Sequence, residues 1–350
     1  MTAKWPGRLH SAWRAYRLRW KRRYFLARAI RRRGQLVSVV NRTDLINPDD
    51  IIVFSTVRNE IERIEHFLEW HRKLGVSHFL IVENQSDDGT AELLAAQPDV
   101  SLWTTKHSYK ASRFGVDWLT FLLFRFGHGH WCLTLDADEL FFPPYSADGA
   151  LRRLVRWLDS VGAEAIGAIM LDLYPKGQLG AQVFEQGQDP LDILRWFDRD
   201  GLHVQERADF RSDLVRGGVR GRLFFEQEPN RAPTLNKVPL IKWNRRYAYM
   251  TSTHIALPPR LNHVAWCGAK ALPSAVLLHT KFLPSIIKKS AEEKLRKEHF
   301  ANSALYDAYY DALAKGPELW SPDSVELDGW QQMTKLGLMK TGDFPDQDRS

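Results

Sequence analysis

From residue 51 onward the chain alternates short, continuously apolar runs with longer amphipathic stretches, and this alternation constrains the fold most. The apolar runs are IIVFSTV at 51–57, HFLIVEN at 78–84, VSLWTT at 100–105 and a run that ends in LTLDAD at 133–138. Helical patterns separate them over 61–75, 88–97 and about 111–127. Apolar strands separated by helices are typical of a parallel sheet covered on both faces. The sequence therefore predicts an α/β fold.

The second half of the chain continues this pattern less regularly. A helix is expected at about 147–161, a strand at 165–174, short strands in KVPLIKW (237–243) and AVLLHTKFL (275–283), and helices from 284 to about 315. Gly, Pro and charged residues dominate 176–235, where we expect active-site loops and no separate domain. We thus predict a mixed, mainly parallel sheet with flanking helices and a helical C-terminal region.

The formal charge of +7 belongs to the N-terminal arm. Residues 1–43 hold 13 Lys and Arg and no Asp or Glu, whereas the remainder has 36 basic and 42 acidic residues. An apolar and aromatic stripe recurs every three or four residues: Trp5, Leu9, Trp13, Tyr16, Trp20 and Tyr24. A basic helix with an aromatic face suits an anionic membrane surface. The alternatives are a solvated, partly disordered arm and a nucleic-acid patch, but no recognisable nucleic-acid motif supports the latter.

Cysteine use and hydropathy bear on the compartment. Cys132 and Cys267 are too few for a disulfide framework and lack the spacing of a zinc site, which favours a reducing compartment. No apolar run reaches about 18 residues, and the N-terminus lacks the pattern of a signal peptide. We expect a cytoplasmic protein, peripheral at the inner face of the cytoplasmic membrane.

Polar residues follow three of the predicted strands, where ligands of parallel sheets bind. They are Thr56, Arg58, Asn59 and Glu60 after the first strand, 83–88 after the second, and Asp136, Asp138 and Glu139 after the fourth. Ionised carboxylates this close repel one another and need a cation or exposure to solvent. Two carboxylates two residues apart can hold a divalent ion that neutralises a diphosphate, although a solvated acidic turn is the alternative.

Three motifs in this order resemble the nucleotide-sugar half of family 2-like glycosyltransferases with the GT-A (Rossmann-like) fold. They are the Asn59-Glu60 pair at a helix start, the polar cluster ending in Asp88-Gly89-Thr90, and Asp136-Ala137-Asp138 as a DxD motif. The resemblance covers about residues 50–145, and the later segments look like the branch found in bacterial surface-polysaccharide clusters. With the basic arm at 1–48 set apart by its charge, the resemblance implies a catalytic domain at 49–283 divided at 145/146, followed by a helical extension at 284–350.

The resemblance also implies roles for single residues. Thr56, Arg58 and Glu60 would border the nucleoside, Glu83 or Asn84 would meet the base or ribose, and Lys110 and Arg113 would contact base or phosphate. Asp136 and Asp138 would bind Mn²⁺ or Mg²⁺, with Asp136 also facing the donor. His279 would be a further metal ligand that favours Mn²⁺, with His254 and then His263 as alternatives. An exposed helix start is the alternative for Lys110 and Arg113.

The expected activity is a metal-dependent, inverting transfer of a sugar from a nucleotide diphosphate sugar, UDP-linked as the first guess. The acceptor would be a saccharide or lipid-linked saccharide in envelope polysaccharide synthesis. Glu226 is the candidate base, with Glu228 and Asp209 as alternatives, and Arg220 and Arg222 are candidates for acceptor or phosphate contacts. The other hypotheses are a non-catalytic nucleotide-sugar or saccharide-binding module and a metal-dependent phosphohydrolase, which would need a denser Asp/His ligand set.

Overall fold

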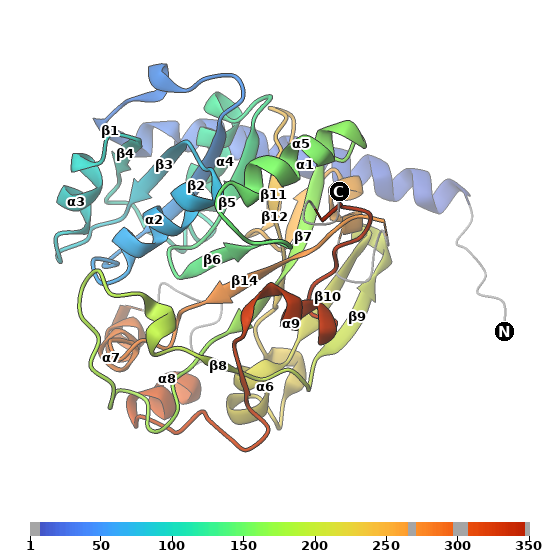
Figure 1. Cartoon of the computed structure of the whole chain (residues 1–350). Helices are drawn as coiled ribbons and strands as arrows, with labels where there is room; N and C mark the ends of the chain where they lie inside the picture. The colour runs from blue at the N-terminus through green and yellow to red at the C-terminus, as the bar shows by residue number, and fades with distance from the viewer. Residues whose placement is uncertain (1–7, 265–270, 297–306, 347–350) are drawn as a thin grey trace, which may run out of the picture.

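A nine-stranded sheet lies at the centre of the computed structural model, which describes residues 8–264, 271–296 and 307–346 (Figure 1). The strand order is β1-β4-β3-β2-β5-β11-β7-β14-β6. The strands are β1 (Val37–Val40), β2 (Ile51–Val57), β3 (His78–Glu83), β4 (Val100–Thr104), β5 (Trp131–Thr134), β6 (Glu139–Phe142), β7 (Ala165–Asp172), β11 (Asn236–Lys242) and β14 (Ala275–His279).

Most of these strands run in the same direction. β2, β3, β4 and β5 are parallel neighbours, and β7 pairs with β14 in parallel. β1, β11 and β6 run antiparallel to their neighbours. The carboxyl ends of β2, β3, β5, β7 and β14 therefore meet at one edge of the sheet, together with the first residues of β11 and β6. We call this the carboxyl edge.

The predicted α/β organisation is confirmed, and the four early apolar runs form β2 to β5. Two edge strands were not expected. Val37–Val40 in β1 is largely exposed on the outer side of β4, so it lacks the continuous apolar signal of a buried strand. β6 begins at Glu139, which belongs to the acidic cluster with Asp136 and Asp138. The Glu139 carboxylate is buried against other parts of the chain, so an acidic residue stands where an apolar one was expected.

Two layers of helices cover the sheet. α2 (Ile64–Leu74), α3 (Thr90–Ala96) and α5 (Ala150–Ser160) pack their apolar side chains into one core cluster. α4 (Val116–Phe126) packs on the opposite face with the hairpin of β12 (Ala248–Thr251) and β13 (Ile255–Leu257). Burial on both faces explains why the parallel strands read as continuous apolar runs.

The segment from 176 to 235, expected as loops, contains regular structure as well. It forms the short strand β8 (Trp196–Phe197), the hairpin of β9 (His203–Arg207) and β10 (Ser212–Arg216), and helix α6 (Gly218–Phe224). Near the C-terminus follow α7 (Ile286–Arg296), α8 (Asp307–Ala314), β15 (Val325–Glu326), which pairs with β8, and α9 (Gly329–Lys335). The hairpin was missed because polar residues occupy its exposed strand β9.

The basic arm forms the helix α1 (Arg8–Arg31) and lies along α4 and the β12–β13 hairpin (Figure 1). Phe25 and Ala29 are buried, Phe25 against Ala248 and Leu257 of the β12–β13 hairpin, and the Nε of Arg28 donates to the buried carboxylate of Asp117 at 2.6 Å. The arm is thus a docked helix. Of the predicted stripe, Trp5 and the side chain of Leu9 lie outside the described residues. No helix in the described part of the chain is long and apolar enough to cross a bilayer.

Candidate active site

The sheet order brings acidic, basic and histidine side chains together at the carboxyl edge. Asp136 and Asp138 lie in the turn between β5 and β6, and His279 is the last residue of β14. β14 lies between β6 and β7, so His279 is paired in register with Glu139 on one side and Asp172 on the other. The turn is held in place because the backbone N–H of Thr280 donates to the carbonyl of Asp138 at 2.7 Å.

A buried chain of polar contacts runs from α6 to the DxD turn. The Nε of Arg220 donates to Oδ2 of Asp172 at 2.7 Å, and Oδ1 of Asp172 lies 2.5 Å from Nδ1 of His279. Nε2 of His279 lies 3.0 Å from Oδ2 of Asp138. A carboxylate on Nδ1 fixes the orientation of the imidazole ring and directs Nε2 at the next ligand. Asp172 therefore orients His279 toward Asp138.

The charges along this chain shift the pKa of each member. Burial opposes ionisation of Asp172, but Arg220 and His279 lower its pKa to about 2. Burial likewise opposes the charge on His279, yet Asp138 and Asp172 raise the pKa of the imidazole. Burial opposes ionisation of Asp138, but His279, Lys281 and Arg63 together lower its pKa well below the usual value. The site thus favours an ionised Asp138.

Lys237, the second residue of β11, supplies a cation to the acidic cluster. Its Nζ donates to Oδ2 of Asp136 at 2.8 Å and also to the buried carboxylate of Glu139. Burial raises the pKa of Glu139 to about 7 although Lys237 opposes this, and the two carboxylates overcome burial to raise the pKa of Lys237. Pro239, also in β11, has no backbone N–H to donate to a neighbouring strand. The pairing of β11 with β7 shifts register between Lys237 and Leu240.

Sequence reasoning missed the roles of Lys237, Asp172 and Lys281. The available signal was a charged residue at the start or end of an otherwise apolar strand, because burying a charge requires a partner. Both Lys237 and Asp172 fit that description in the runs 237–243 and 165–174. The sequence could not name the partners, which come from other strands.

The donor atoms around Asp138 suit a divalent ion carried by a diphosphate. Adjacent ligands of an octahedral ion at about 2.1 Å lie about 3 Å apart, as the facing atoms of Asp138 and His279 do. Asp136 is engaged by Lys237, and no group of three His, Cys, Asp or Glu residues forms a complete metal cage in the described ranges. Magnesium-type sites commonly use one or two protein ligands, with phosphate and water filling the rest. Asp138 and His279 therefore fit an ion that completes its coordination with other ligands.

The residues predicted to border the nucleoside lie at the ends of β2 and β3. Thr56 lines the same small cavity as Asp136, Tyr249 and Thr253, and its buried hydroxyl has no hydrogen-bond partner among the described residues. Glu83 is buried and accepts from the Thr104 hydroxyl at 2.7 Å. The structure thus places Thr56 beside the DxD turn, while Glu83 supports the end of β3.

Asn84 holds the loop after β4. Its side-chain amide donates to the carbonyls of Thr105 and His107 at 2.9 and 3.1 Å. Because its amide makes these hydrogen bonds, Asn84 supports the loop that leads toward Lys110.

Arg58 and Glu60 face helix α7. The guanidinium of Arg58 lies 2.9 Å from the Glu292 carboxylate, and Nζ of Lys289 lies 3.2 Å from Oε2 of Glu60. Glu60 also pairs with Arg63, whose guanidinium donates to the Thr280 carbonyl beside Asp138. These contacts join the loop after β2 to the segment after β14.

Arg113, which was predicted to contact base or phosphate, lies between α1 and β12. Its guanidinium lies 3.9 Å from the centre of the Phe25 ring of α1 and donates to the Tyr249 carbonyl at 2.7 Å. It also lies 3.5 Å from the Asp117 carboxylate. Arg113 therefore joins α1 to β12. Lys110 lies three residues earlier in the same loop.

The remaining predicted residues make no hydrogen bond or ion pair with Asp138 in the part of the chain that the structure describes. Nδ1 of His254 contacts the Asn236 carbonyl at 2.7 Å, and burial lowers its pKa to about 4. The side chain of His263 falls outside the described residues. Glu226 is exposed beyond α6, where it lines a hollow of about 360 Å³ with Asp198 and Arg222. The structure thus brings His279 to Asp138 and leaves Glu226 in a separate hollow.

Comparisons with known proteins give little further guidance. No protein-family model matches the chain, and no curated protein matches it. One solved structure, 4-diphosphocytidyl-2C-methyl-D-erythritol synthase, is 18% identical over 40% of this chain and 68% of that chain, with a TM-score of 0.25. At that score the likeness carries no argument, so the functional conclusion rests on the site itself.

Proposed function

We propose that the protein is a metal-dependent glycosyltransferase that uses a nucleotide diphosphate sugar, with a UDP-sugar as the first candidate. The observation that carries the proposal is the pairing of Asp138 with an oriented His279 at the carboxyl edge, with Asp136 in the same turn. This edge is where open α/β sheets bind nucleotides. The resemblance of the three sequence motifs to those of family 2-like glycosyltransferases supports a nucleotide sugar as the donor.

Different side chains would bind or position different parts of the donor site. Asp138 and His279 would hold a divalent ion, which supplies Lewis-acid stabilisation of a diphosphate leaving group. Arg63 and Lys281 act electrostatically on Asp138 and would add positive charge near the same phosphates. Lys237 holds Asp136 in place, and Asp172 keeps the Nδ1 proton of His279.

In the proposed reaction, helix α6 would contribute to the acceptor site. Arg220 of α6 contacts Asp172, while Arg222 of the same helix donates to the Asp198 carboxylate at 2.7 Å in the hollow of about 360 Å³. A hollow with carboxylates and guanidinium groups suits the hydroxyls of a saccharide. We propose that the acceptor enters there, with Glu226 contacting its hydroxyls, and transfer into envelope polysaccharide as the biological role.

A thermal-shift titration with UDP and Mn²⁺ tests the donor site. Wild-type protein should gain stability with both ligands together and little with either alone, since a ligand of the folded state raises the melting temperature. Asp138→Asn should lose this gain. Asp159→Asn is the matched control because Asp159 pairs with Lys242 at the opposite edge of the sheet. Equal gains for wild type and Asp138→Asn would contradict the proposal.

Product analysis separates the alternative functions. Release of nucleoside diphosphate from a UDP-sugar with Mn²⁺ supports a transferase, because the bond to the sugar is the one that breaks. Release of sugar phosphate supports the phosphohydrolase hypothesis. Donor binding without turnover across a set of saccharide acceptors supports the binding module.

A further inference from the structure

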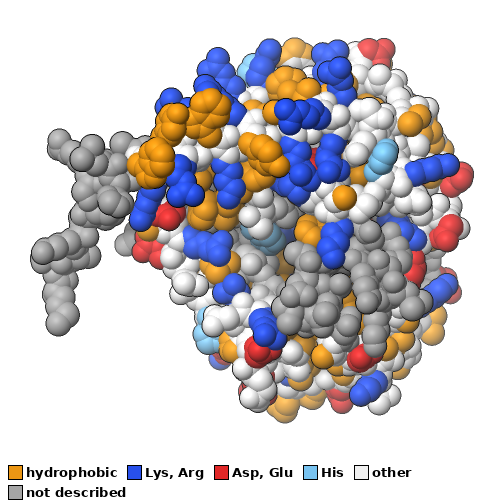
Figure 2. Space-filling model, turned by 180° about the vertical axis from the view of Figure 1, so that it is seen from behind, with side chains coloured by type: hydrophobic (Ala, Val, Ile, Leu, Met, Phe, Trp, Pro, Cys, Tyr) orange, Lys and Arg blue, Asp and Glu red, His pale blue; other side chains and the backbone are white. Residues whose placement is uncertain are grey.

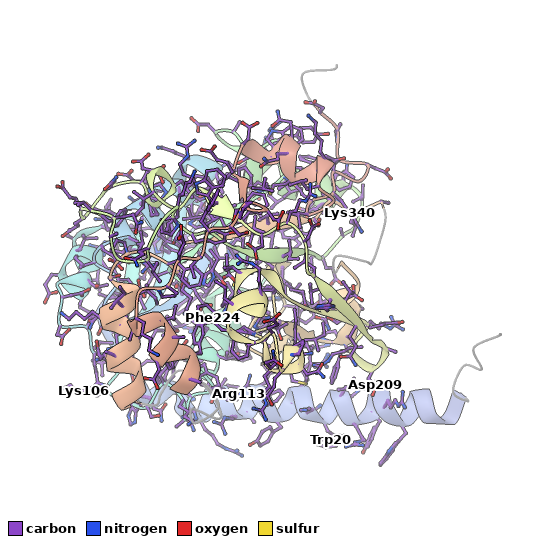
Figure 3. The ribbon with its side chains drawn as sticks, turned by 90° about the horizontal axis from the view of Figure 1, so that it is seen from below. Trp20, Lys106, Arg113, Asp209, Phe224 and Lys340 are labelled. Carbon is purple, nitrogen blue, oxygen red and sulfur yellow. The ribbon has the colours of Figure 1, made fainter. Side chains whose placement is uncertain are left out.

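The outer face of α1 carries an exposed aromatic stripe. Trp13, Tyr16, Trp20 and Tyr24 are between 49% and 59% exposed, and the centre of the Tyr16 ring lies 5.9 Å from that of Trp13 and 6.2 Å from that of Trp20. Figure 2 shows hydrophobic side chains interspersed with Lys and Arg along this helix, and Figure 3 shows Trp20 pointing away from the rest of the protein. Large rings that the fold leaves outside on one line are suited to a membrane interface.

Beside the stripe, an arginine groove of about 1230 Å³ separates α1 from the body of the protein. Helix α1 contributes Arg14, Arg19, Arg22 and Arg23 to its lining. The body contributes Arg211, Arg246 and Arg260. Asp209 is the acidic residue in this lining and pairs with Arg14, and Arg260 pairs with Glu164. The remaining guanidinium groups leave the groove strongly positive.

Arg22 lies in the groove among several other positively charged side chains. The buried Nε of Arg22 has no hydrogen-bond partner in the described part of the chain. Burial lowers the pKa of its guanidinium, and the charges of Arg19, Arg260 and Arg23 add to this. A partly buried guanidinium without a carboxylate partner is stabilised by an anionic ligand with several oxygen atoms, such as a phosphate.

The stripe and the groove belong to one surface. The guanidinium of Arg23 lines the groove and also lies 5.0 Å from the centre of the Trp20 ring. We propose that this composite surface docks the protein on an anionic lipid bilayer. The aromatic stripe enters the interface, and the groove binds phosphate groups of the lipid headgroups.

A series of contacts connects α1 to the candidate active site. Arg113 contacts Phe25 of α1 and the carbonyl of Tyr249, and Tyr249 lines the small cavity that contains Asp136. The proposal goes beyond the glycosyl transfer proposed above and does not depend on it. It requires the body arginines as well as the arm, which distinguishes it from binding by a detached basic tail.

Flotation of the full chain with vesicles tests the proposal. At 0.1 M NaCl, vesicles of phosphatidylglycerol mixed with phosphatidylcholine should carry the protein. Vesicles of phosphatidylcholine alone should not, because a neutral lipid surface provides no electrostatic attraction. Arg211→Glu/Arg246→Glu, which changes only the body, should weaken binding at least tenfold. Trp13→Ser/Trp20→Ser should also weaken binding at least tenfold. Point variants are used because α1 packs on the body.

The matched control is Lys73→Glu/Arg156→Glu, which makes the same charge change on α2 and α5 at the opposite face. It should bind like the wild type, and all variants should keep the wild-type melting temperature. Wild-type binding by Arg211→Glu/Arg246→Glu would overturn the proposal, as would an equal loss in the control. Stronger binding to duplex DNA than to anionic vesicles, abolished by the same body variant, would also overturn it.

Discussion

At the scale of single residues, Lys237 is the clearest case of a charge whose partners determine its effect. Its ammonium group lies between Asp136, which is half exposed, and Glu139, which is fully buried. Removal of one partner of a buried ion pair leaves an uncompensated charge, whereas removal of both partners is often tolerated. Lys237 therefore stabilises the DxD turn chiefly through Glu139.

We predict that Lys237→Met lowers the free energy of unfolding by about 3 kcal/mol, because the Glu139 carboxylate loses its buried partner. The double variant Lys237→Met/Glu139→Gln should recover more than half of that loss. Chemical denaturation of the two variants and the wild type measures both effects. A double variant no more stable than Lys237→Met would show that Lys237 acts mainly through Asp136.

At the scale of elements, α1 has two opposite faces with different roles. Phe25 and Ala29 face the body of the protein and are buried, while the rings of Trp13, Tyr16 and Trp20 face outward. The basic side chains Arg28 and Arg32 both reach the carboxylate of Asp117 on α4. The arm is therefore part of the folded unit through one face and available for a surface through the other.

Phe25→Ala should lower the free energy of unfolding by about 3 kcal/mol, since truncation of a buried Phe removes its apolar contacts and leaves a cavity. The same change should uncover Arg113, whose guanidinium lies over the Phe25 ring. Tyr16→Ala is the matched control on the exposed face and should change stability by less than about 0.5 kcal/mol. Urea denaturation compares the two; equal losses would mean that the inner face does not hold the helix.

At the scale of the whole molecule, a buried neutral histidine ties one helical layer to the sheet. Nδ1 of His71 in α2 donates to the Phe67 carbonyl at 2.7 Å, and Nε2 accepts from the backbone N–H of Phe141 in β6 at 3.2 Å. Burial lowers the pKa of His71 to about 3. Both ring nitrogens are needed in the neutral form, because protonation would remove the acceptor for Phe141.

This pKa predicts a loss of stability in acid. The unfolded chain, with a histidine pKa near 6.5, binds the proton more readily than the folded protein, so the contribution of His71 is complete above pH 6.5 and falls as the pH decreases toward 3. At pH 5 it should be about 2 kcal/mol smaller than at pH 7.5. His71→Gln, which cannot titrate, should flatten the stability profile between these values. Parallel profiles for both proteins would contradict this role.

The local order of the fold could be predicted because it follows from short-range patterns. The apolar runs at 51–57 and 78–84 form β2 and β3, and the aromatic repeat of the arm forms a helix. The proximity of Thr56 to Asp136 also followed, since parallel strands end at the same edge. β6 was missed because Glu139 opens it, and a buried glutamate has no apolar signal.

By itself, the sequence determined the α/β class, the polar strand ends and the basic arm, because periodicity and composition act along the chain. Only the tertiary structure decided which charges meet. Lys237 reaches Asp136 across 101 residues, and His279 reaches Asp138 across 141, through strands that become neighbours only in the assembled sheet. The docking of α1 was decided in the same way, since the partner of Arg28 is the buried Asp117, 89 residues away. Burial makes these pairings strong, and burial exists only once the layers have packed.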